Sequence, residues 1–268
     1  MTTADPSAGP AALTERRANV LIITINRPEA RNAVNAAVST ALGDALQQAQ
    51  DDPEVRAVVL TGAGDRSFCA GADLKAIARR ENLFHPEHPE WGFAGYVRHF
   101  IDKPTIAAVN GTALGGGTEL ALASDLVVAE ERAQFGLPEV KRGLLAAAGG
   151  VFRIVDQLPR KVGLELMLTG EPMTAADALR WGLINRVVAD GTVLGEALEL
   201  AEVITANAPL AVQASKRVAY GADGGVVPGD DPGWDRTNRE IVALLRSEDA
   251  KEGPRAFAEK RQPVWRAR

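Results

Sequence analysis

Short runs of branched apolar residues alternate with stretches of helical periodicity over the first half of the chain. Residues 20–26 and 55–61 predict buried β-strands because they are rich in valine and isoleucine. Between them, residues 34–50 carry apolar positions spaced by three and four, which predicts a helix that stops at Asp51-Asp52-Pro53. Residues 101–109 contain a third predicted strand, which leads into a glycine-rich turn. Strands separated by helices need crossover connections, so we expect an α/β fold with mostly parallel pairing.

The pattern changes to mostly helical from Val162 onward. Helical spacing covers residues 194–207, 210–220 and 234–268, and a Gly/Pro/Asp-rich loop occupies residues 221–233. The polar, proline-bearing stretch 79–100 predicts a mobile flap over a site. We therefore divide the chain into a disordered tail (1–12), a core (13–200) with its flap (79–100), and a helical oligomerisation region (201–268).

Composition narrows the functional class. The chain has 268 residues, 46% of them hydrophobic, and a net charge of −5, which gives no general attraction to nucleic acid or to an anionic membrane. No apolar run has the length that spans a bilayer, and residues 1–10 lack the basic start and apolar centre of a signal peptide. The single cysteine, Cys69, excludes an internal disulfide framework and favours a cytoplasmic location.

Three consecutive glycines, Gly115 to Gly117, precede a predicted helix. Without side chains they let a ligand approach backbone N–H groups at a helix N-terminus, where negative charge is favoured. Glu119 follows in the first helical turn and would repel a phosphate. A carbonyl oxygen that becomes negatively charged during reaction suits this turn better.

A second turn of small residues, Ala70-Gly71-Ala72, lies before another short predicted helix, which Asp73 could cap. Two such turns could each supply one N–H group to a single oxygen. We therefore predict a two-donor oxyanion hole, against the alternative that both are ordinary strand-to-helix turns.

Glu119 and Glu139 are the candidate acid and base. Most glutamates are solvated surface groups, but both of these lie among apolar and small residues. A pair that flanks one reacting carbon would explain their burial. If they lie close together, one of them should be held protonated, because two adjacent carboxylates resist double ionisation.

Several histidine, cysteine and basic residues could bind a ligand or react, but each also has a plain structural or surface interpretation. His85 and His88 have the spacing of a weak metal pair without a third ligand, so we predict surface residues and no metal. Cys69 lacks a histidine partner nearby in sequence and is expected to be a packed small residue. Lys75, Lys260 and Arg261 could contact phosphates or simply form a solvated charged face.

From about residue 19 to the end, the chain resembles the enoyl-CoA hydratase/isomerase (crotonase) superfamily. The resemblance rests on five stretches: 26–28 (NRP), 68–74 (FCAGADL), 103–111 (KPTIAAVNG), 113–117 (ALGGG) and 134–139 (QFGLPE). It implies a spiral core of repeated ββα units, a helical C-terminal trimerisation region, and homotrimers that often pair into hexamers. It also implies an acyl-CoA substrate, with coenzyme A entering as part of that substrate and no permanently bound cofactor.

The resemblance also implies roles for individual residues. The thioester oxygen would lie between the N–H groups of Ala72 and Gly116, Glu119 would activate water, and Glu139 would handle the proton at the α-carbon. The acyl-pocket candidates are Trp91, Phe93, Leu137 and Ala147. Coenzyme A would lie near Arg27, Arg31, Ala33, Ala70, Asp73, Leu74, Lys75, Gly115, Phe257 and Lys260, of which the last two could reach the coenzyme A of a neighbouring subunit.

Both superfamily glutamates are present, which favours hydration of a 2,3-enoyl-CoA. Residues 178–188 and 247–265 and the flap element 92–95 are most similar to carnitinyl-CoA dehydratases, so a lyase for a cationic acyl chain is one alternative. Trp91 or Phe93 could then contact the cation. An enoyl-CoA isomerase and a non-catalytic acyl-CoA-binding protein are two more functions that the resemblance leaves open.

One stretch departs from the superfamily pattern. Typical hydratases have Pro-Gly-Ala-Gly-Gly where this chain has alanines at 146–148 before two glycines. We expect the methyl group of Ala147 to lie beside the reacting water. If position 147 needed a positive φ, alanine there would cost about 1–2 kcal/mol.

Overall fold

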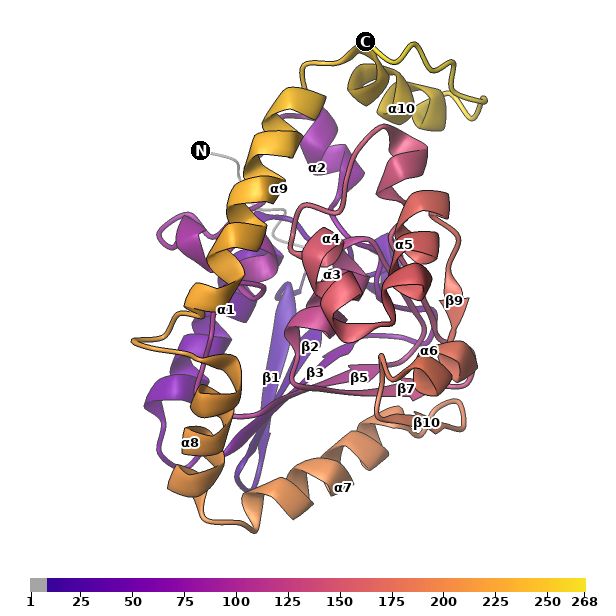
Figure 1. The fold of residues 1–268 in the computed structure, drawn as a ribbon. Coiled ribbons are helices and arrows are strands. Elements are labelled where there is room, and N and C mark those ends of the chain that lie inside the picture. The colour runs from indigo at the N-terminus through magenta and orange to yellow at the C-terminus, as the bar shows by residue number, and fades with distance from the viewer. Residues whose placement is uncertain (1–8) are drawn as a thin grey trace.

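The computed structural model describes residues 9–268 and is built around a six-stranded sheet in the order β1-β2-β3-β5-β7-β10 (Figure 1). Strand β1 pairs antiparallel with β2, and the other neighbours run parallel, as the crossover argument predicts. The strands of this sheet are β1 (Ala12–Arg17), β2 (Val20–Ile25), β3 (Ala57–Gly62), β5 (Thr105–Val109), β7 (Leu126–Glu130) and β10 (Arg186–Val188).

Both faces of the main sheet are covered, which explains why its central strands are apolar throughout. Along β3, Val58 and Leu60 belong to the larger core, and the alternating residues Ala57 and Val59 belong to a smaller one. Helix α7 (Val193–Thr205) closes the smaller core and crosses below the sheet in Figure 1. Helix α1 (Ala36–Asp51) packs into the larger core on the other face.

A second sheet, in the order β4-β6-β8-β9, determines where the candidate site forms. Its strands are β4 (Ser67–Cys69), β6 (Thr112–Leu114), β8 (Gln134–Gly136) and β9 (Met173–Thr174). The first three are parallel neighbours, so their carboxyl ends lie at one edge. Each end leads directly into a turn that the sequence analysis singled out. Ligands of open α/β sheets commonly bind at such carboxyl ends.

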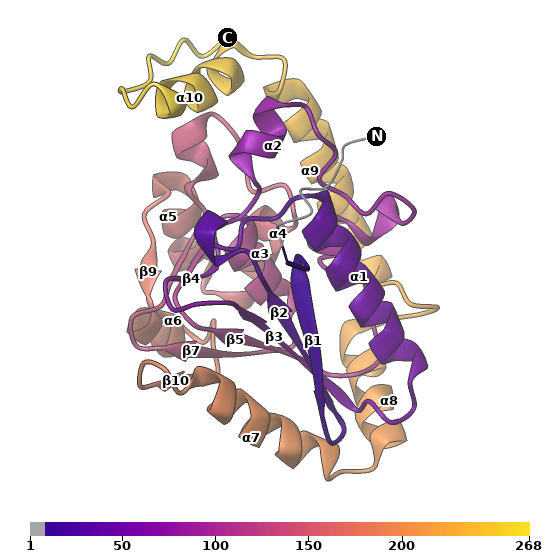
Figure 2. The ribbon, with the colours of Figure 1, turned by 180° about the vertical axis from the view of Figure 1, so that it is seen from behind.

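The remaining helices surround these sheets (Figure 2). They are α2 (Leu74–Ala78), α3 (Gly116–Ala123), α4 (Gly150–Gln157), α5 (Arg160–Thr169), α6 (Ala175–Trp181), α8 (Pro209–Tyr220), α9 (Asp231–Leu244) and α10 (Glu248–Ala258). Short 3-10 helices occur at η1 (Pro28–Ala30), η2 (Pro89–Trp91), η3 (Phe93–Gly95), η4 (Pro138–Arg142) and η5 (Pro228–Asp230). The predicted cap of α2 is confirmed, since Asp73 accepts the backbone N–H groups of Lys75 and Ala76, and Thr174 caps α6 by accepting the N–H of Asp177.

Two predicted segments differ from expectation. Of the predicted tail, residues 1–8 lie outside the described residues, and the end of the tail is fixed by Asn26. The backbone N–H of Asn26 donates to Ala11 O and its side-chain Nδ2 donates to Pro10 O. The predicted flap is also more ordered than expected, because residues 92–97 are buried and η3 packs against α1. Its exposed residues are 79, 80, 82, 84, 86, 87, 89, 90 and 98.

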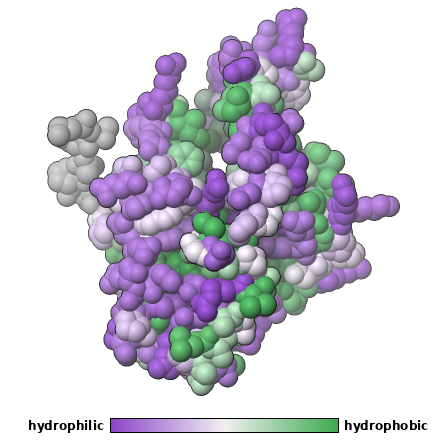
Figure 3. All heavy atoms as spheres, turned by 60° about the vertical axis from the view of Figure 1, so that its left-hand side comes forward, coloured by the Kyte–Doolittle hydropathy of each residue, from purple (hydrophilic) through white to green (hydrophobic). Residues whose placement is uncertain are grey.

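The side of the molecule shown in Figure 3 is mostly hydrophilic, with hydrophobic side chains gathered in its lower part. Helix α8 exposes Leu210 and Val218, which are 77% and 82% accessible. Among the described residues, no helix combines the length and the apolar character required to cross a bilayer.

Candidate active site

The turns after β4 and β6 touch each other. A Cβ atom at Gly71 would lie 3.1 Å from the backbone N of Gly116, and one at Gly116 would lie 3.2 Å from the Cα of Gly71. Such close approach requires residues without side chains on both turns. The adjacent strands β4 and β6 thus bring together the two turns that sequence reasoning paired.

The two predicted donor groups have no acceptor within the described part of the chain. The bridge between Val34 and Ala72 uses the N–H groups of Val34 and Asp73, and leaves the N–H of Ala72 without a partner. The N–H of Gly116, the first residue of α3, is likewise unpaired there. Backbone donors without acceptors at a junction of turns are suited to binding a ligand oxygen.

Glu119 lies one turn into α3 and is 3% exposed. Its Oε1 accepts the backbone N–H of Gly150 at 2.8 Å, at the start of α4. A Cβ atom at Gly150 would lie 2.9 Å from that oxygen. The carboxyl group is therefore buried between the N-terminal ends of α3 and α4.

Glu139 reaches the same junction from the end of β8. A Cβ atom at Gly115 would lie 2.8 Å from its Oε1, so the carboxyl group rests on the residue just before Gly116. Gly115 has a φ of +56°, a conformation that glycine adopts without strain. Among the described residues, Oε2 of Glu139 is buried without a hydrogen-bond partner.

Burial raises the pKa of both carboxyl groups. For Glu119, burial has the largest effect, and the negative charge of Glu139 raises its pKa further. The N–H groups of Gly150 and Ala148 and the cation of Arg153 oppose this rise in the pKa of Glu119. The two groups interact, so they titrate as a pair that tends to retain a proton near neutral pH.

We expect the pair to make stability depend on pH. Because both folded-state pKa values lie above the unfolded value of about 4.3, their contribution is fully present below that pH and is lost as pH rises through the raised values. The slope reaches about 1.4 kcal/mol per pH unit for one group. Glu119→Gln should reduce the pH dependence of the free energy of unfolding, since glutamine does not ionise and still accepts the N–H of Gly150. Urea unfolding at about pH 5 and about pH 8 measures how the free energy of unfolding changes with pH in the wild type and in the variant. An equal change in both proteins would contradict the expectation.

Arg27 and Asp73, both predicted near coenzyme A, bind each other. Arg27 Nη2 lies 3.0 Å from Asp73 Oδ2, and its Nη1 donates to Ala33 O at 2.6 Å. Burial would raise the pKa of Asp73, but the N–H groups of Ala76 and Lys75 and the Arg27 guanidinium hold it below its usual value. This pair fixes the turn that carries Ala72.

The other residues predicted near coenzyme A are mostly at the surface. Arg31, Leu74, Lys75 and Lys260 are exposed, whereas Ala70 is partly buried next to Gly71. Phe257 lies on α10, and the guanidinium of Arg142 lies 4.1 Å from the centre of its ring.

Helix α10 packs on η4, the short helix that carries Glu139. A Cβ atom at Gly253 would lie only 2.0 Å from the carbonyl oxygen of Arg142. Helix α10 therefore lies against the segment that carries Glu139.

The acyl-pocket candidates do not all lie together. Phe93 contacts the glycine turn, because a Cβ atom at Gly116 would lie 2.4 Å from its ring. Leu137 is buried in the core just before Glu139. Ala147 is partly buried and does not have a positive φ, so the conditional strain at this position does not arise; the positive φ of +100° occurs at Gly149.

Trp91 lies in a stack of rings beside α1. His88 and His99 stack on its two faces, each with a ring-centre distance of 4.0 Å. Its faces are therefore covered, and a cation–π contact with a substrate would need one of them free. Phe93 remains the aromatic candidate beside the glycine turns.

His85 is not the surface residue that the sequence predicted. It is 2% exposed, and its Nδ1 accepts the N–H groups of Glu87 and His88, so Nε2 donates to Asp44 at 3.1 Å. Among the described residues, no group of three or more His, Cys, Asp or Glu side chains could hold a metal ion.

Cys69 is completely buried, and burial raises the pKa of its thiol to about 12. The prediction of a packed residue is confirmed. A thiol that stays protonated at neutral pH is a poor nucleophile.

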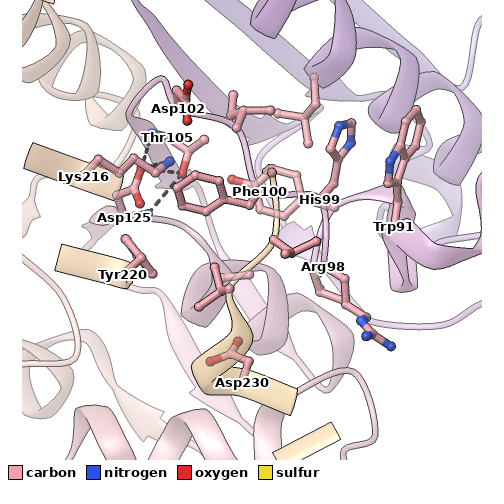
Figure 4. A pocket seen from close by; sticks show the side chains of 18 of the residues that line it. Trp91, Arg98, His99, Phe100, Asp102, Thr105, Asp125, Lys216, Tyr220 and Asp230 are labelled. Carbon is pink, nitrogen blue, oxygen red and sulfur yellow. Dashed lines mark hydrogen bonds and ion pairs between the residues drawn. The ribbon is translucent and has the colours of Figure 1, made fainter. Parts of the chain in front are cut away.

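A separate cavity of about 630 Å³ is lined by residues of α4, α8 and α9 and of the segment 96–102 (Figure 4). Its lining includes Trp91, Arg98, Arg153 and Trp234, but neither glutamate and neither oxyanion-hole candidate. Figure 4 also shows Lys216 against Asp125, an ion pair of 2.7 Å that ties α8 to the core.

Sequence reasoning missed Gly150 and Arg153. The signal for Gly150 was available, since Gly149-Gly150 precedes a helix just as the first glycine turn does. Arg153 follows this turn by one helical turn, but its position near Glu119 follows only from the tertiary structure.

Comparison with known proteins agrees with this geometry. The enoyl-CoA hydratase/isomerase family model matches residues 15–268. A carnitinyl-CoA dehydratase from Salmonella paratyphi A is 45% identical over 256 residues, which are 94% of this chain and 97% of the relative. The structure of a carnitinyl-CoA dehydratase from Mycobacterium avium 104 is 79% identical, with a TM-score of 0.94, over 97% of this chain and all of that chain. The structure of an enoyl-CoA hydratase from Mycobacterium tuberculosis H37Rv is 47% identical, with a TM-score of 0.76 over the same shares.

Proposed function

Because the chain belongs to the enoyl-CoA hydratase/isomerase family, we propose that it is a hydro-lyase that adds water across the 2,3 double bond of an enoyl-CoA thioester and removes it in reverse. The observation that carries the proposal is the junction at the ends of β4, β6 and β8. There, two adjacent turns whose N–H groups have no acceptor among the described residues adjoin the buried Glu119 and the partly buried Glu139, both with raised pKa values. An isomerase, which only moves a proton, has less need of two carboxyl groups.

The junction suggests a role for each group. The N–H groups of Ala72 and Gly116 donate to the thioester oxygen and stabilise the enolate. Glu119 takes a proton from water as the water oxygen bonds to C3, and the electrons of the double bond move to the thioester oxygen. Glu139 then gives its proton to C2, and the thioester re-forms. One carboxyl group gains a proton and the other loses one, so the pair holds one proton throughout.

Coenzyme A would lie along the surface between η1 and α2. Arg31 and Lys75 are exposed there, and Lys260 is exposed beyond the end of α10. These exposed cations are suited to the phosphates of coenzyme A. Asp73 would act indirectly, since its ion pair with Arg27 holds the turn in place.

A carnitinyl-CoA dehydratase is the second candidate. The names of relatives with 45% and 79% identity favour it. Its substrate carries a trimethylammonium group, for which the ring of Phe93 beside Gly116 is the candidate contact.

A substrate panel tests the proposal. Loss of the enoyl-thioester absorbance would be followed with crotonyl-CoA, longer enoyl-CoAs and crotonobetainyl-CoA. We expect turnover of at least one, and a kcat/KM at least tenfold higher for crotonobetainyl-CoA would select the second candidate. Tight binding of all three without turnover would instead indicate a non-catalytic acyl-CoA-binding protein.

We also propose a homotrimer or a dimer of trimers, assembled through the helical region 201–268, in the cytoplasm. The exposed apolar side chains of α8, including Leu210 and Val218, are suited to such an interface. Coenzyme A would be bound only as part of the substrate.

A further inference from the structure

Arg153 is a buried cation on the far side of the turn that holds Glu119. It lies in the first turn of α4, where its backbone N–H donates to Gly149 O at 3.0 Å. Its side chain is 15% exposed and folds back on the same turn, since a Cβ atom at Gly149 would lie 3.0 Å from its Nη1. The residue after Gly149, Gly150, donates its N–H to Glu119.

The guanidinium is held from the C-terminal region. Its Nη2 lies 2.7 Å from Oδ2 of Asp230, at the end of η5. Its carbon lies 5.3 Å from the ring centre of Trp234 on α9 and 5.5 Å from that of Phe152. These contacts fix the side chain between α4, η5 and α9.

One nitrogen of this guanidinium has no partner. Among the described residues, Nη1 of Arg153 is buried without a hydrogen-bond acceptor, and it is the nitrogen nearest Gly149. An unpaired donor is costly to bury, so its retention calls for an explanation. Shielded from solvent, its charge acts on neighbouring carboxyl groups more strongly than a surface charge would.

We infer that Arg153 is a positioning residue for Glu119, and that Asp230 holds it in place from the C-terminal region. Arg153 supports the Gly149-Gly150 turn that binds Glu119 and supplies the positive charge that favours its ionised form. This inference rests on the proposed function, and it gives region 201–268 a part in the site beyond oligomerisation.

The groups that face Glu119 define the test. They are the carboxyl group of Glu139, the thiol of Cys69 and the cation of Arg153, together with the N–H groups of Ala148 and Gly150. Of these, Arg153 is the cation, so removing its charge should make Glu119 harder to ionise. Asp156 and Arg98 line the cavity together with Arg153, and neither is among the groups that face Glu119.

The first measurement is the pH profile of kcat with Arg153→Gln, Arg153→Lys and Asp230→Asn. We expect Arg153→Gln to lower kcat about 10- to 100-fold, to change KM less than about threefold, and to move the acidic limb to higher pH. Arg153→Lys should return the acidic limb of the kcat profile to its wild-type pH. Asp230→Asn should move this limb to higher pH by less than Arg153→Gln does. Arg98→Gln is the matched control, because Arg98 also lies over Trp234, at 4.9 Å, without contacting the Gly149 turn; its limb should not move.

The second measurement needs no activity. Urea unfolding of Arg153→Gln should depend more steeply on pH than that of the wild type, and Glu119→Gln combined with Arg153→Gln should abolish the difference. An unchanged pH profile together with a pH-independent loss of stability would reduce Arg153 to a structural role and overturn the inference. Absence of turnover in the wild type, with the unfolding coupling intact, would reject the proposed function and leave the coupling established.

Discussion

Glu119→Gln and Glu139→Gln should each lower kcat for hydration by about 10²- to 10⁴-fold, with little change in KM. Each substitution keeps the shape of the side chain and removes its ability to exchange a proton. Because hydration needs one carboxyl group to accept a proton while the other donates one, the double variant should be little slower than either single variant. Stopped-flow measurement of the enoyl-thioester absorbance follows these rates.

The control for this pair is another buried glutamate. Glu130 on β7 is 2% exposed and binds Arg132 at 2.6 Å, away from the glycine turns. Glu130→Gln should lower stability, because it weakens the ion pair between a buried carboxylate and the exposed Arg132, and leave kcat unchanged. By contrast, Glu119→Gln should keep or raise stability near neutral pH. Full turnover in the Glu119 and Glu139 variants would remove both from the catalytic assignment.

Replacing the amide at Ala72 by an ester should lower kcat by about 10²- to 10³-fold, which corresponds to about 2.7–4 kcal/mol of transition-state stabilisation. Incorporation of lactic acid at position 72 removes the N–H and preserves the methyl group. The fold should tolerate this change with a small loss of stability, because that N–H has no acceptor among the described residues and the Gly71 carbonyl, as an ester, becomes a weaker acceptor for the N–H of Val34. Hydration kinetics and thermal unfolding of the same sample measure the two effects separately.

Ala72→Gly is the matched control, since it removes the methyl group and keeps the N–H. Its kcat should stay within a few-fold of the wild type. If the ester lost no more activity than this glycine variant, the oxygen-binding role of position 72 would be wrong. A loss of stability in the ester of more than about 1.5 kcal/mol, beyond what the weaker Gly71 carbonyl explains, would show instead that this N–H has a structural partner.

The local elements followed from the sequence because their signals are short-range. Branched residues at 20–25 and 57–62 formed buried strands, and Asp73 capped its helix as expected. The three-residue strands β4, β6 and β8 were missed, because so few residues show no periodicity. The resemblance to a known family was needed to relate the turns that follow them.

The flap shows why burial was harder to predict than secondary structure. Its polar and aromatic composition suggested an exposed segment, yet His85 and Phe93 are buried. Each finds its partner far away in sequence, in α1 for His85 and at Gly116 for Phe93. Such partners compensate for burying a polar ring, and a single-sequence pattern does not reveal them.

By itself, the sequence determined which residues could do chemistry: two glycine-rich helix starts with free N–H groups, and two glutamates in apolar surroundings. Only the tertiary structure decided that they meet, because the parallel order of β4, β6 and β8 places three separate strand ends at one edge. It also decided the environment of Glu119, where burial, Glu139 and Arg153 act together on one carboxyl group. Charge interactions depend on distance and on solvent exclusion, and neither is fixed until the chain has folded.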